Sequence, residues 1–466
     1  MTTSNGKRHV ILGAGPAGLN AIDTIRILGD NNSSITLICG EPAYSRMVLP
    51  YYLAGDIVEK AVFTGDSDYF EKQKVHTIFD KQARAINPQA KSVTLDDGSS
   101  VEYDDLLIAV GTSAVTPPIP GSTLAGVINM WTLNDAKKYL AAAGPRSEVV
   151  IIGAGFIGLI ILDALHKKGA QITFVELEKN ILPRMIDTRG AELTEQWMKD
   201  RGVKVLTGTK VSEITEEPIG RKTLRLSDGT TITADVVIMA TGIKPNLDLI
   251  GGSGIEASDA IHVNNRMLTN VPDVYAAGDV AAGPDLVTGG RASGHYIQPT
   301  AVDHGRVAGA NMAGVPIEYA GSLSMNVLDA LGLQVTSFGQ WQVENADNTV
   351  VINDKDGIYR KLVWQGDIIV GSVMIGGAED VSNLNDLGMI KGFIQAKAPL
   401  GKWKEYIQDN PLDIRRPYIA TKTAEKLLKI TLLKKPSAPG GYRYPALPPD
   451  TVRTPWHKIL AAEAPE

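Results

Sequence analysis

Two glycine triplets have the spacing that binds the diphosphate of a dinucleotide. The first is GAGPAG at residues 13–18, and the second is GAGFIG at residues 153–158. In such a loop the first glycine permits a tight turn, the second lets the backbone approach the diphosphate, and the third lets the next helix pack against the strand. The diphosphate then lies at the positive end of that helix. The glycines are Gly13, Gly15 and Gly18 in the first triplet, and Gly153, Gly155 and Gly158 in the second.

Each triplet stands in the order of elements that a Rossmann-like fold requires. Residues 10–12 and 149–152 are apolar runs typical of buried strands, and a helical apolar period follows each triplet. The next predicted strand ends near an acidic residue in both copies, Glu41 in the first and Glu176 in the second. A carboxylate at this place can accept hydrogen bonds from an adenosine ribose. A glycine triplet alone would also fit an ordinary turn, but the complete order is specific.

A second repeated feature follows each glycine loop. An Asp-Gly hairpin signal at residues 97–98 precedes the apolar stretch YDDLLIAVGT, and another at residues 228–229 precedes ADVVIMATGIKPN. The separation between the hairpin glycine and the turn glycine, Gly111 or Gly242, is the same in both copies. Duplication of one dinucleotide-binding fold is the economical explanation. The sequence therefore predicts an α/β protein with two Rossmann-like domains.

Composition and charge limit the kinds of partner. The chain has 466 residues, 44% hydrophobic and 21% charged, which is enough for two or three domains with cores of their own. A net charge of −6 provides no broad basic field for nucleic acid or for an anionic membrane surface. No apolar stretch reaches the roughly 18 to 20 residues that cross a bilayer, and no apolar leader precedes the first predicted strand. We expect a soluble, cytoplasmic protein that acts on small molecules.

The cysteine count restricts the redox chemistry. Cys39 is the only cysteine, which excludes an intramolecular disulfide, a Cys-x-x-Cys pair and an iron–sulfur cluster ligated within the chain. No metal site is predicted. Any cluster in the electron path would belong to a partner protein.

Together the motifs resemble the FAD-dependent pyridine nucleotide-disulfide oxidoreductase superfamily, over about residues 8 to 400. The resemblance implies that the first fold binds FAD, that the second binds NAD(P)H, and that the FAD domain is completed by sequence that follows the NAD domain. That return is TNVPDVYAAGDVAAG, in which Asp279 is implied to bond the ribityl chain of the flavin. The segment QPTAVDHGRVAGANMAG resembles the helix whose N-terminal amides, here near Thr300 and Ala301, face the flavin pyrimidine. A solvated loop and surface helix are the alternative for this segment.

The resemblance assigns both ligands and domains. The implied FAD-binding residues are Gly13, Gly15, Gly18, Glu41, Arg46, Gly111, Asp279, Thr300 and Ala301, and the implied NAD-binding residues are Gly153, Gly155, Gly158, Glu176 and Gly242. The implied domains are residues 1–115 (FAD, first part), 116–244 (NAD), 245–318 (FAD, second part), 319–405 (an α+β C-terminal interface domain) and 406–466 (a C-terminal extension).

The stretch YSRMVLPYYLAG departs from one branch of that superfamily and approaches another. It resembles the CGLPYY segment of the NADH oxidase and coenzyme A-disulfide reductase branch, but Met47 stands at the position of the redox cysteine. A thioether forms no thiolate, so disulfide reduction and cysteine-dependent oxygen reduction are disfavoured. The stretch also resembles nitrite reductase FAD modules and ferredoxin and rubredoxin reductases, which implies electron transfer. Arg46 is then the candidate FAD contact, although an exposed loop arginine would look the same.

No catalytic acid or base is predicted, and Tyr51, Tyr52 and Ile160 are the candidates for the flavin and nicotinamide site. Much of the superfamily has glutamate where this chain has Ile160, and branches that pair it with lysine have that lysine at the position of Tyr51. The absence of both the glutamate and the lysine is physically consistent, because either charge left alone in a buried site would cost roughly 3 to 5 kcal/mol. We expect an apolar nicotinamide pocket with Tyr51 or Tyr52 as a gate over the flavin. Ordinary core packing of Ile160 is the alternative.

The acidic residues after the second fold's strand predict the nucleotide. Glu176 and Glu178 favour NADH over NADPH, because no arginine stands immediately beside them to bind a 2'-phosphate. Solvation of both carboxylates at a strand end is the alternative.

The resemblance implies an FAD-dependent NADH:acceptor oxidoreductase. Hydride would pass from NADH to flavin N5, and electrons would then pass to a ferredoxin, a rubredoxin or another iron–sulfur partner. The alternatives are a flavoprotein subunit of a larger redox complex with a mainly structural NAD fold, and a peroxide-forming NADH oxidase. A homodimer is also open. His295 and His304 are expected to be structural hydrogen bonders, with assistance to a proton transfer as the alternative. The basic, proline-rich end of the chain either packs on its own subunit or docks on an acidic iron–sulfur partner.

Overall fold

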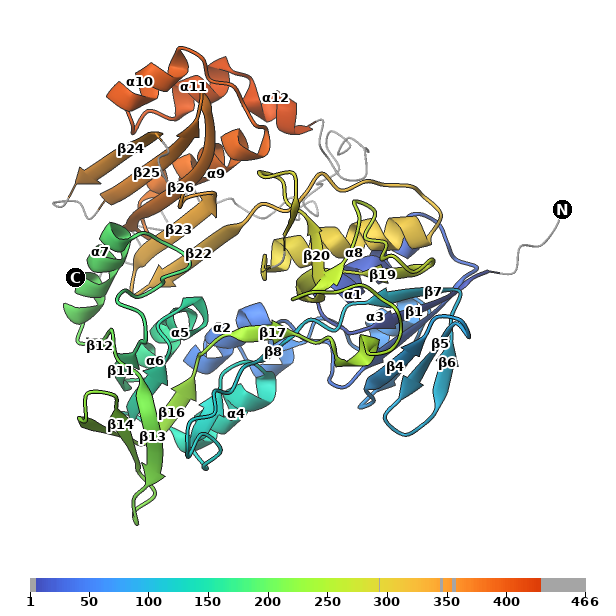
Figure 1. The fold of residues 1–466 in the computed structure, drawn as a ribbon, viewed down its shortest axis with the longest axis horizontal. Helices are drawn as coiled ribbons and strands as arrows, with labels where there is room; N and C mark the ends of the chain where they lie inside the picture. The colour runs from blue at the N-terminus through green and yellow to red at the C-terminus, as the bar shows by residue number, and fades with distance from the viewer. Residues whose placement is uncertain (1–5, 293, 344–346, 354–357, 429–466) are drawn as a thin grey trace, which may run out of the picture.

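The computed structural model describes residues 6–292, 294–343, 347–353 and 358–428 (Figure 1). Its first sheet is assembled from strands that lie far apart in the sequence, because a late strand, β19, adds beside β7 in parallel register. This sheet and the helices against it are called the first fold. In spatial order its strands are β19 (Val274–Ala276), β7 (Asp105–Ile108), β1 (Arg8–Leu12), β2 (Ser34–Cys39) and β3 (Val75–Phe79).

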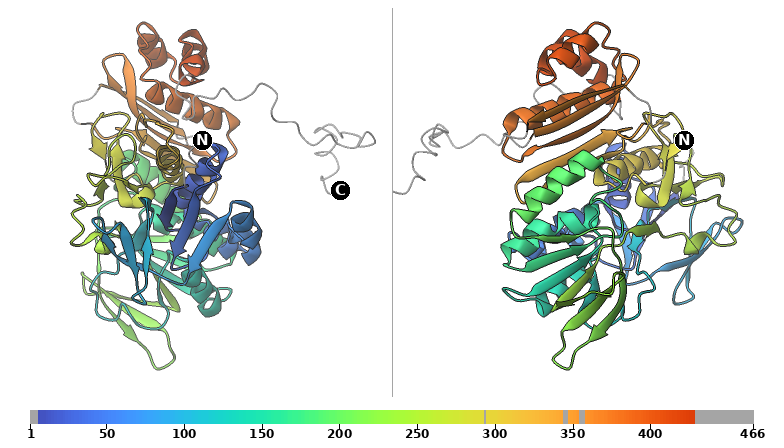
Figure 2. Two further views of the ribbon diagram at one scale, coloured as in Figure 1. Left: turned by 90° about the vertical axis from the view of Figure 1, so that its right-hand side faces the viewer. Right: turned by 60° about the vertical axis from the view of Figure 1, so that its left-hand side comes forward.

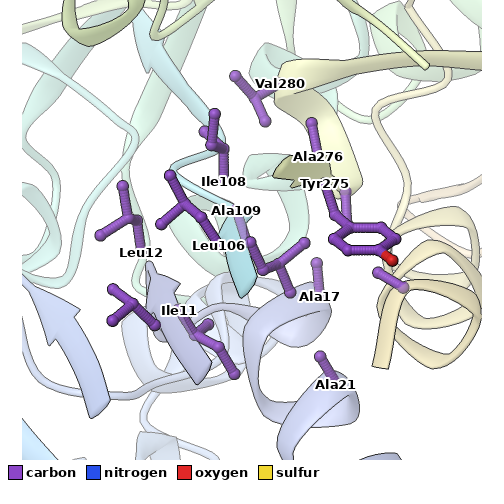
Figure 3. Close-up of a cluster of buried hydrophobic side chains, with 14 of the residues drawn as sticks. Ile11, Leu12, Ala17, Ala21, Leu106, Ile108, Ala109, Tyr275, Ala276 and Val280 are labelled. Carbon is purple, nitrogen blue, oxygen red and sulfur yellow. The ribbon is translucent and has the colours of Figure 1, made fainter. Parts of the chain in front are cut away.

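Two helices with small residues at their contact cover one face of this sheet (Figure 3). They are α1 (Pro16–Ile27), which follows the first glycine triplet, and α8 (Gln298–Met312), which follows β19. A Cβ on Gly305 would lie 2.2 Å from the carbonyl oxygen of Ala17, so glycine is what lets the helices approach this closely. Core side chains of β1, β7 and β19, including Ile11, Ile108 and Tyr275, pack around α1 in the same cluster.

The second fold repeats the strand order of the first. Its sheet is parallel, and β10 pairs with β11 on one side and with β16 on the other, as β1 pairs with β2 and β7. In spatial order its strands are β9 (Val127–Asn129), β16 (Val236–Met239), β10 (Glu148–Ile152), β11 (Gln171–Val175) and β12 (Lys204–Leu206). Its helices are α4 (Leu133–Ala142), α5 (Phe156–Ile160), α6 (Leu162–Lys167) and α7 (Thr188–Lys199). The predicted pair of Rossmann-like folds is confirmed.

Each fold also carries a small antiparallel sheet before the strand that ends at the turn glycine. In the first fold it consists of β4 (Ala83–Asn87), β5 (Ser92–Leu95) and β6 (Ser100–Glu102), and in the second of β13 (Val211–Glu216), β14 (Lys222–Leu226) and β15 (Thr231–Ala234). Both hairpin signals found in the sequence lie in these sheets, so they mark matching places of the duplicated unit.

The chain passes between the two folds through a short two-stranded ribbon. β8 (Thr112–Ala114) leaves the first fold and β17 (Ile243–Pro245) leaves the second, and they pair antiparallel. The amide of Val115 bonds the carbonyl of Gly242, and the amide of Asn246 bonds the carbonyl of Gly111. The two turn glycines therefore lie at the same junction.

A C-terminal sheet is stacked over the second fold (Figure 2). In spatial order its antiparallel strands are β22 (Met325–Ala330), β23 (Leu333–Gly339), β26 (Ile368–Gly377), β25 (Ile358–Gln365) and β24 (Asp347–Asn353). Leu328, Val335, Ile375 and Tyr359 are cross-strand neighbours in one row, and all four belong to the core cluster of the second fold. The opposite face packs against α9 (Val381–Gln395), which confirms the predicted α+β C-terminal domain.

Short elements complete the described part of the chain. They are η1 (Arg46–Val48), α2 (Leu49–Ala54), η2 (Glu59–Val62), α3 (Ser67–Lys72), η3 (Asp248–Ile250), β18 (Ile261–His262), η4 (Gly278–Val280), β20 (Ala281–Pro284), β21 (Arg291–Ala292), α10 (Trp403–Asp409), α11 (Arg415–Ala420) and α12 (Thr423–Leu428). The predicted extension at residues 406–466 thus begins with helices, and its part after residue 428 lies outside the described residues. The domain boundaries given above stay predictions.

Candidate functional site

One cavity of about 850 Å³ lies between the two folds and reaches the start of the C-terminal sheet. Both glycine loops open into it, and its volume falls within the roughly 300 to 1,000 Å³ of cofactor and ligand pockets. The predicted site residues that line it are Gly13, Gly15, Glu41, Arg46, Gly111, Gly153, Gly155, Ile160, Glu176, Gly242, Asp279 and Ala301. Gly18, Gly158, Thr300, Tyr51 and Tyr52 are not among the lining residues.

The two glycine loops have the same geometry. A Cβ on Gly18 would lie 2.0 Å from the carbonyl oxygen of Gly13, and a Cβ on Gly158 would lie 2.4 Å from that of Gly153. The third glycine of each triplet is therefore required for close packing and stays out of the cavity. A Cβ on Gly15 or on Gly155 would meet nothing within 4 Å, so each loop leaves open space at the position where a diphosphate is expected. The residues present fit two dinucleotides.

The first fold's acidic residue is already held by its neighbours. The Nη2 atom of Arg46 lies 2.6 Å from Oε1 of Glu41, and the Tyr44 hydroxyl donates to Oε2 at 2.7 Å. The Glu41 side chain keeps 39% of its surface exposed and lines the cavity. It is therefore fixed in orientation and still accessible to a ribose.

Glu176 is more deeply placed than a solvated strand-end residue would be. It is 7% exposed, and its two carboxylate oxygens accept hydrogen bonds from the amides of Ala154, at 2.7 Å, and Glu178, at 2.9 Å. Ala154 lies inside the second glycine loop, so Glu176 ties that loop to the end of β11. Glu178 is exposed and lines the same cavity. Arg184, which follows Glu178 by six residues, and Lys210 also line the cavity.

Asp279 lies half-buried at the turn that follows β19. The Thr112 hydroxyl donates to its Oδ2 at 3.3 Å, and Arg46 donates to the carbonyl of Thr112 at 3.3 Å. Burial raises the pKa of Asp279, while the Thr112 hydrogen bond and the charge of Arg46 oppose that rise. A carboxylate held in this way can accept hydrogen bonds from the hydroxyls of a ligand. The sequence motif identified Asp279, but Thr112 carried no signal.

The stretch that contains Met47 borders the cavity, but not through the two tyrosines that were predicted to face it. Met47, Pro50 and Leu53 line the cavity, whereas Tyr51 points outward with 57% of its surface exposed. Tyr52 packs beside the second fold's core cluster. The turn of α2 places its two tyrosines outside the cavity lining, so neither Tyr51 nor Tyr52 covers the cavity in this structure. Local sequence fixed the residue types but not the rotation of this short helix.

Ile160 lies at the end of α5, half-buried. It lines the cavity together with Phe156 and Ile157, and it packs against the second fold's core cluster. The wall expected near the nicotinamide is therefore apolar at this point. Both interpretations of Ile160 apply, because the side chain contacts the core and faces the cavity.

The N-terminal end of α8 opens on the cavity through Ile297, Gln298 and Ala301. The amide of Ala301 is used within the helix, where it donates to the Ile297 carbonyl at 3.2 Å. Amides before it in the first turn have no acceptor within a helix, and the proline at residue 299 has no N–H. The amides of Gln298 and Thr300 therefore have no acceptor within the helix, and of these two residues only Gln298 lines the cavity.

The two histidines near this helix have structural partners. His304 is 2% exposed, its Nδ1 accepts from the amide of Gly278 at 3.3 Å, and its Nε2 lies 3.2 Å from the Ser322 hydroxyl. Burial, with a smaller contribution from the charge of His295, lowers the pKa of His304 to about 3. His295 lines the cavity and lies 3.3 Å from Asp285, and burial lowers its pKa also. Neutral His304 is a hydrogen-bonding support for the Gly278 turn.

Within the described residues, no group of three or more His, Cys, Asp or Glu side chains is placed to hold a metal ion. No helix in the described ranges is both long and apolar enough to cross a membrane.

Comparison with protein families gives two matches. Residues 7–294 match the model of the pyridine nucleotide-disulphide oxidoreductases, which covers the parallel sheets of both folds and ends before α8. Residues 325–390 match the C-terminal domain of rubredoxin NAD⁺ reductase, which covers the C-terminal sheet and part of α9.

Individual proteins extend the comparison. The chain is 33% identical to subunit epsilon of the NADH-dependent phenylglyoxylate dehydrogenase of Aromatoleum evansii, over 88% of this chain and 96% of that subunit. It is 30% identical to the nitrite reductase [NAD(P)H] of Bacillus subtilis, over 81% of this chain and 46% of that enzyme. Among solved structures, the NADH:rubredoxin oxidoreductase of Clostridium acetobutylicum superposes with a TM-score of 0.68 and 26% identity, over 85% of this chain and 96% of that one.

Proposed function

The chain belongs to the pyridine nucleotide-disulphide oxidoreductase family, and from that premise we propose that it transfers electrons between NADH and an iron–sulfur protein through a bound FAD. As a member of this family it is an FAD-dependent NAD(P)H oxidoreductase. The observation that carries the proposal is that both glycine loops enter the same cavity, because this brings two dinucleotide sites together.

The residues of the first fold would hold FAD. The loop at Gly13, Gly15 and Gly18 would receive its diphosphate, Glu41 its ribose, and Asp279 its ribityl hydroxyls. Arg46, Gly111 and the first turn of α8 would complete the site. The second fold would hold NADH through its loop at Gly153, Gly155 and Gly158, its acidic residues and Gly242. When bound, FAD supplies a hydride acceptor that can return electrons singly.

The protein's own contribution to this chemistry is position and exclusion. The apolar wall at Ile160 and Phe156 would keep water from the nicotinamide and would place no charge beside it. Met47 supplies no thiolate where the redox cysteine of one branch stands, and burial raises the pKa of the Cys39 thiol, the one cysteine of the chain, which disfavours its thiolate. Electrons would then leave the reduced flavin directly, and we propose a partner protein as their acceptor.

An iron–sulfur acceptor fits what the chain lacks and what some of its relatives are named for. Its one cysteine cannot ligate a cluster, and its C-terminal sheet matches the rubredoxin NAD⁺ reductase domain. The structural neighbour from Clostridium acetobutylicum is an NADH:rubredoxin oxidoreductase. A rubredoxin or ferredoxin is therefore the class of acceptor that we propose, and a cytoplasmic location and a homodimer are parts of the same proposal.

A second candidate function is favoured by one comparison. The relative from Aromatoleum evansii is a subunit of an NADH-dependent dehydrogenase, and the chain spans 96% of it at 33% identity. By analogy the present chain would be the flavoprotein subunit of a larger redox complex. In that role electrons could also flow from an iron–sulfur subunit toward NAD⁺.

An anaerobic titration of the purified flavoprotein with NADH, and separately with NADPH, tests the first step. NADH is expected to bleach the visible flavin band within the mixing time, and NADPH much more slowly. A protein that neither nucleotide bleaches would have lost the donor role of its second fold.

The acceptor is tested by adding oxidised ferredoxin or rubredoxin to the NADH-reduced protein. Rapid reduction of the iron protein would support the reductase. Rapid formation of hydrogen peroxide in air, with no reduction of either iron protein, would instead favour a peroxide-forming oxidase. Stable co-purification with a cluster-bearing subunit would favour the complex.

A further inference from the structure

Trp131 belongs to the second fold, yet it borders the cavity beside residues of the first. It lies between β9 and α4, and its ring lines the cavity. The guanidinium carbon of Arg46 lies 5.1 Å from the ring centroid, within the range of a cation–π contact. The indole N–H donates to the Thr112 carbonyl at 2.9 Å. One side chain thus contacts both the arginine and the ribbon that leaves the first fold.

Thr112 connects this indole to the rest of the site. Its carbonyl accepts from Trp131 and also from Nη1 of Arg46, at 3.3 Å, while its hydroxyl donates to Asp279 at 3.3 Å. Arg46 is held between the Thr112 carbonyl, the indole face and the carboxylate of Glu41. Three independent contacts therefore fix one guanidinium at the cavity wall.

A second connection runs from the same segment to Glu41. The amide of Leu133, the first residue of α4, donates to the Tyr44 hydroxyl at 3.2 Å. That hydroxyl donates in turn to Glu41 at 2.7 Å. The start of α4 is itself rigid, because the side chains of Thr132 and Asp135 form a capping box. Both ends of the Glu41–Arg46 ion pair are thus tied to residues 131–133.

We propose that Trp131 is an FAD-positioning residue supplied by the second fold, and that FAD binding stabilises the segment 131–133. Arg46 and Glu41 lie where the adenosine and diphosphate part of FAD is expected, so any ligand there acts on groups that Trp131 and Tyr44 hold. FAD bound to the first fold then helps to hold the second fold in place, in addition to the nucleotide that the second fold binds itself. The inference rests on the proposed function, because it takes FAD as the ligand of the first fold.

Affinity for FAD tests the positioning role. Trp131→Phe keeps an aromatic face for Arg46 but removes the N–H, and Trp131→Ala removes both. FAD is titrated into the apoprotein, and binding is followed by quenching of flavin fluorescence. The dissociation constant should rise about threefold in Trp131→Phe and tenfold or more in Trp131→Ala.

The chain offers a matched control in Trp197. Its indole N–H also donates to a backbone carbonyl, that of Leu331 at 3.1 Å, and its ring also carries a guanidinium, that of Arg201. It does not line the cavity, so Trp197→Phe should leave FAD affinity unchanged. Equal FAD affinity in the wild type and both Trp131 variants would overturn the proposal. A wild-type apoprotein that binds no FAD would refute the proposed function itself.

Hydrogen exchange tests whether FAD stabilises the segment 131–133. FAD should slow amide exchange in peptides that contain Leu133, because it stabilises the Glu41–Tyr44 contact to which that amide is bonded. In Tyr44→Phe the hydroxyl is absent, and the extra protection by FAD should be lost there while peptides from α7 behave as in the wild type. Identical FAD protection at Leu133 in the variant and the wild type would show that Tyr44 transmits nothing.

Discussion

Cys39 and Glu176 occupy the same position in the two glycine-loop folds. The amide of Gly13 donates to the carbonyl just before Cys39, and the amide of Gly153 donates to the carbonyl just before Glu176, both at 2.8 Å. The Glu176 carboxylate reaches back to an amide inside its glycine loop. In the first fold a thiol stands at that place, so no carboxylate can do the same.

Because Cys39 corresponds to Glu176, the acidic residue of the first fold, Glu41, corresponds to Glu178 of the second fold and not to Glu176. Two residues beyond Cys39 stands Glu41, and two residues beyond Glu176 stands Glu178. Glu41, which is partly exposed, and Glu178, which is exposed, both line the cavity, and Glu176 is the buried member that braces a loop. The structure therefore adds Glu178 as a candidate ribose ligand beside the predicted Glu176.

Changing Glu178 should alter nucleotide preference more than stability. Glu178→Ala removes an exposed acceptor and a negative charge that would repel a 2'-phosphate. The KM for NADH should rise about tenfold, the effect of losing a hydrogen bond to a charged group, while that for NADPH should rise less. Flavin bleaching at varied nucleotide concentration measures both. The exposed helix residue Glu192 gives the control, and an unchanged NADH to NADPH ratio in Glu178→Ala would contradict the assignment.

Alanine at the third glycine of the NAD loop should lower stability, whereas alanine at the second glycine should weaken NADH binding. In Gly158→Ala the new methyl would lie 2.4 Å from the Gly153 carbonyl oxygen, so overpacking should cost about 1 to 3 kcal/mol of stability. In Gly155→Ala the methyl meets no protein atom within 4 Å, so the fold should persist and NADH binding should weaken. Thermal melting and NADH titration separate the two. Equal melting temperatures for both variants would show that the loop relaxes more than the geometry allows.

A carboxylate at position 160 should slow flavin reduction. Ile160→Glu places an acid beside apolar side chains such as Phe156, where burial raises its pKa and disfavours charge. The rate of flavin bleaching by NADH should fall about tenfold at pH 7 and recover in part as the pH is lowered and the acid becomes neutral. Ile160→Gln is the uncharged control. Unchanged hydride transfer in Ile160→Glu would remove the apolar pocket as an explanation.

His304 should make the protein less stable in acid. Its folded pKa is about 3, below the unfolded value of 6.5, so between these pH values the unfolded state binds a proton that the folded state does not. Stability is lost as the pH falls through this window, by up to about 1.4 kcal/mol per pH unit. Denaturant melts of wild type and His304→Gln between pH 7 and pH 4 should show a smaller slope in the variant. The same slope in both would place the acid sensitivity elsewhere.

The C-terminal domain contains a buried ion pair, and removing only one of its two charges should lower the stability of the domain. Arg360 and Asp386 are 3% and 8% exposed at their side chains and lie 2.8 Å apart. Asp386→Ala should destabilise the domain by about 3 to 5 kcal/mol, because it leaves a buried guanidinium uncompensated. The double variant Arg360→Met, Asp386→Leu should recover most of that loss in melting experiments. If the double variant melts as low as the single one, packing rather than charge explains the effect.

Much of the fold could be predicted because its constraints are local. The order of strand, glycine loop and helix, repeated at residues 8–27 and 148–167, reflects steric contacts within one short unit, and those contacts recur in the structure. Met47 already showed that the stretch at residues 44–55 carries no redox cysteine, whereas the structure alone shows that Cys39, at the end of β2, lines the cavity. The rotation of α2, which turns Tyr51 outward, could not be predicted, because a helix of six residues has too little apolar periodicity to fix its orientation.

The sequence by itself determined that two dinucleotide sites exist and which glycines build them, since a missing Cβ is a property of single positions. The tertiary structure alone decided that Trp131 and Tyr44 support the Glu41–Arg46 pair and that Glu178 corresponds to Glu41. It also decided that the amide of Ala301 is hydrogen-bonded within α8. These relations join segments that are far apart in the chain. They depend on how the two folds dock and on strand register, and neither leaves a periodic or local mark on the sequence.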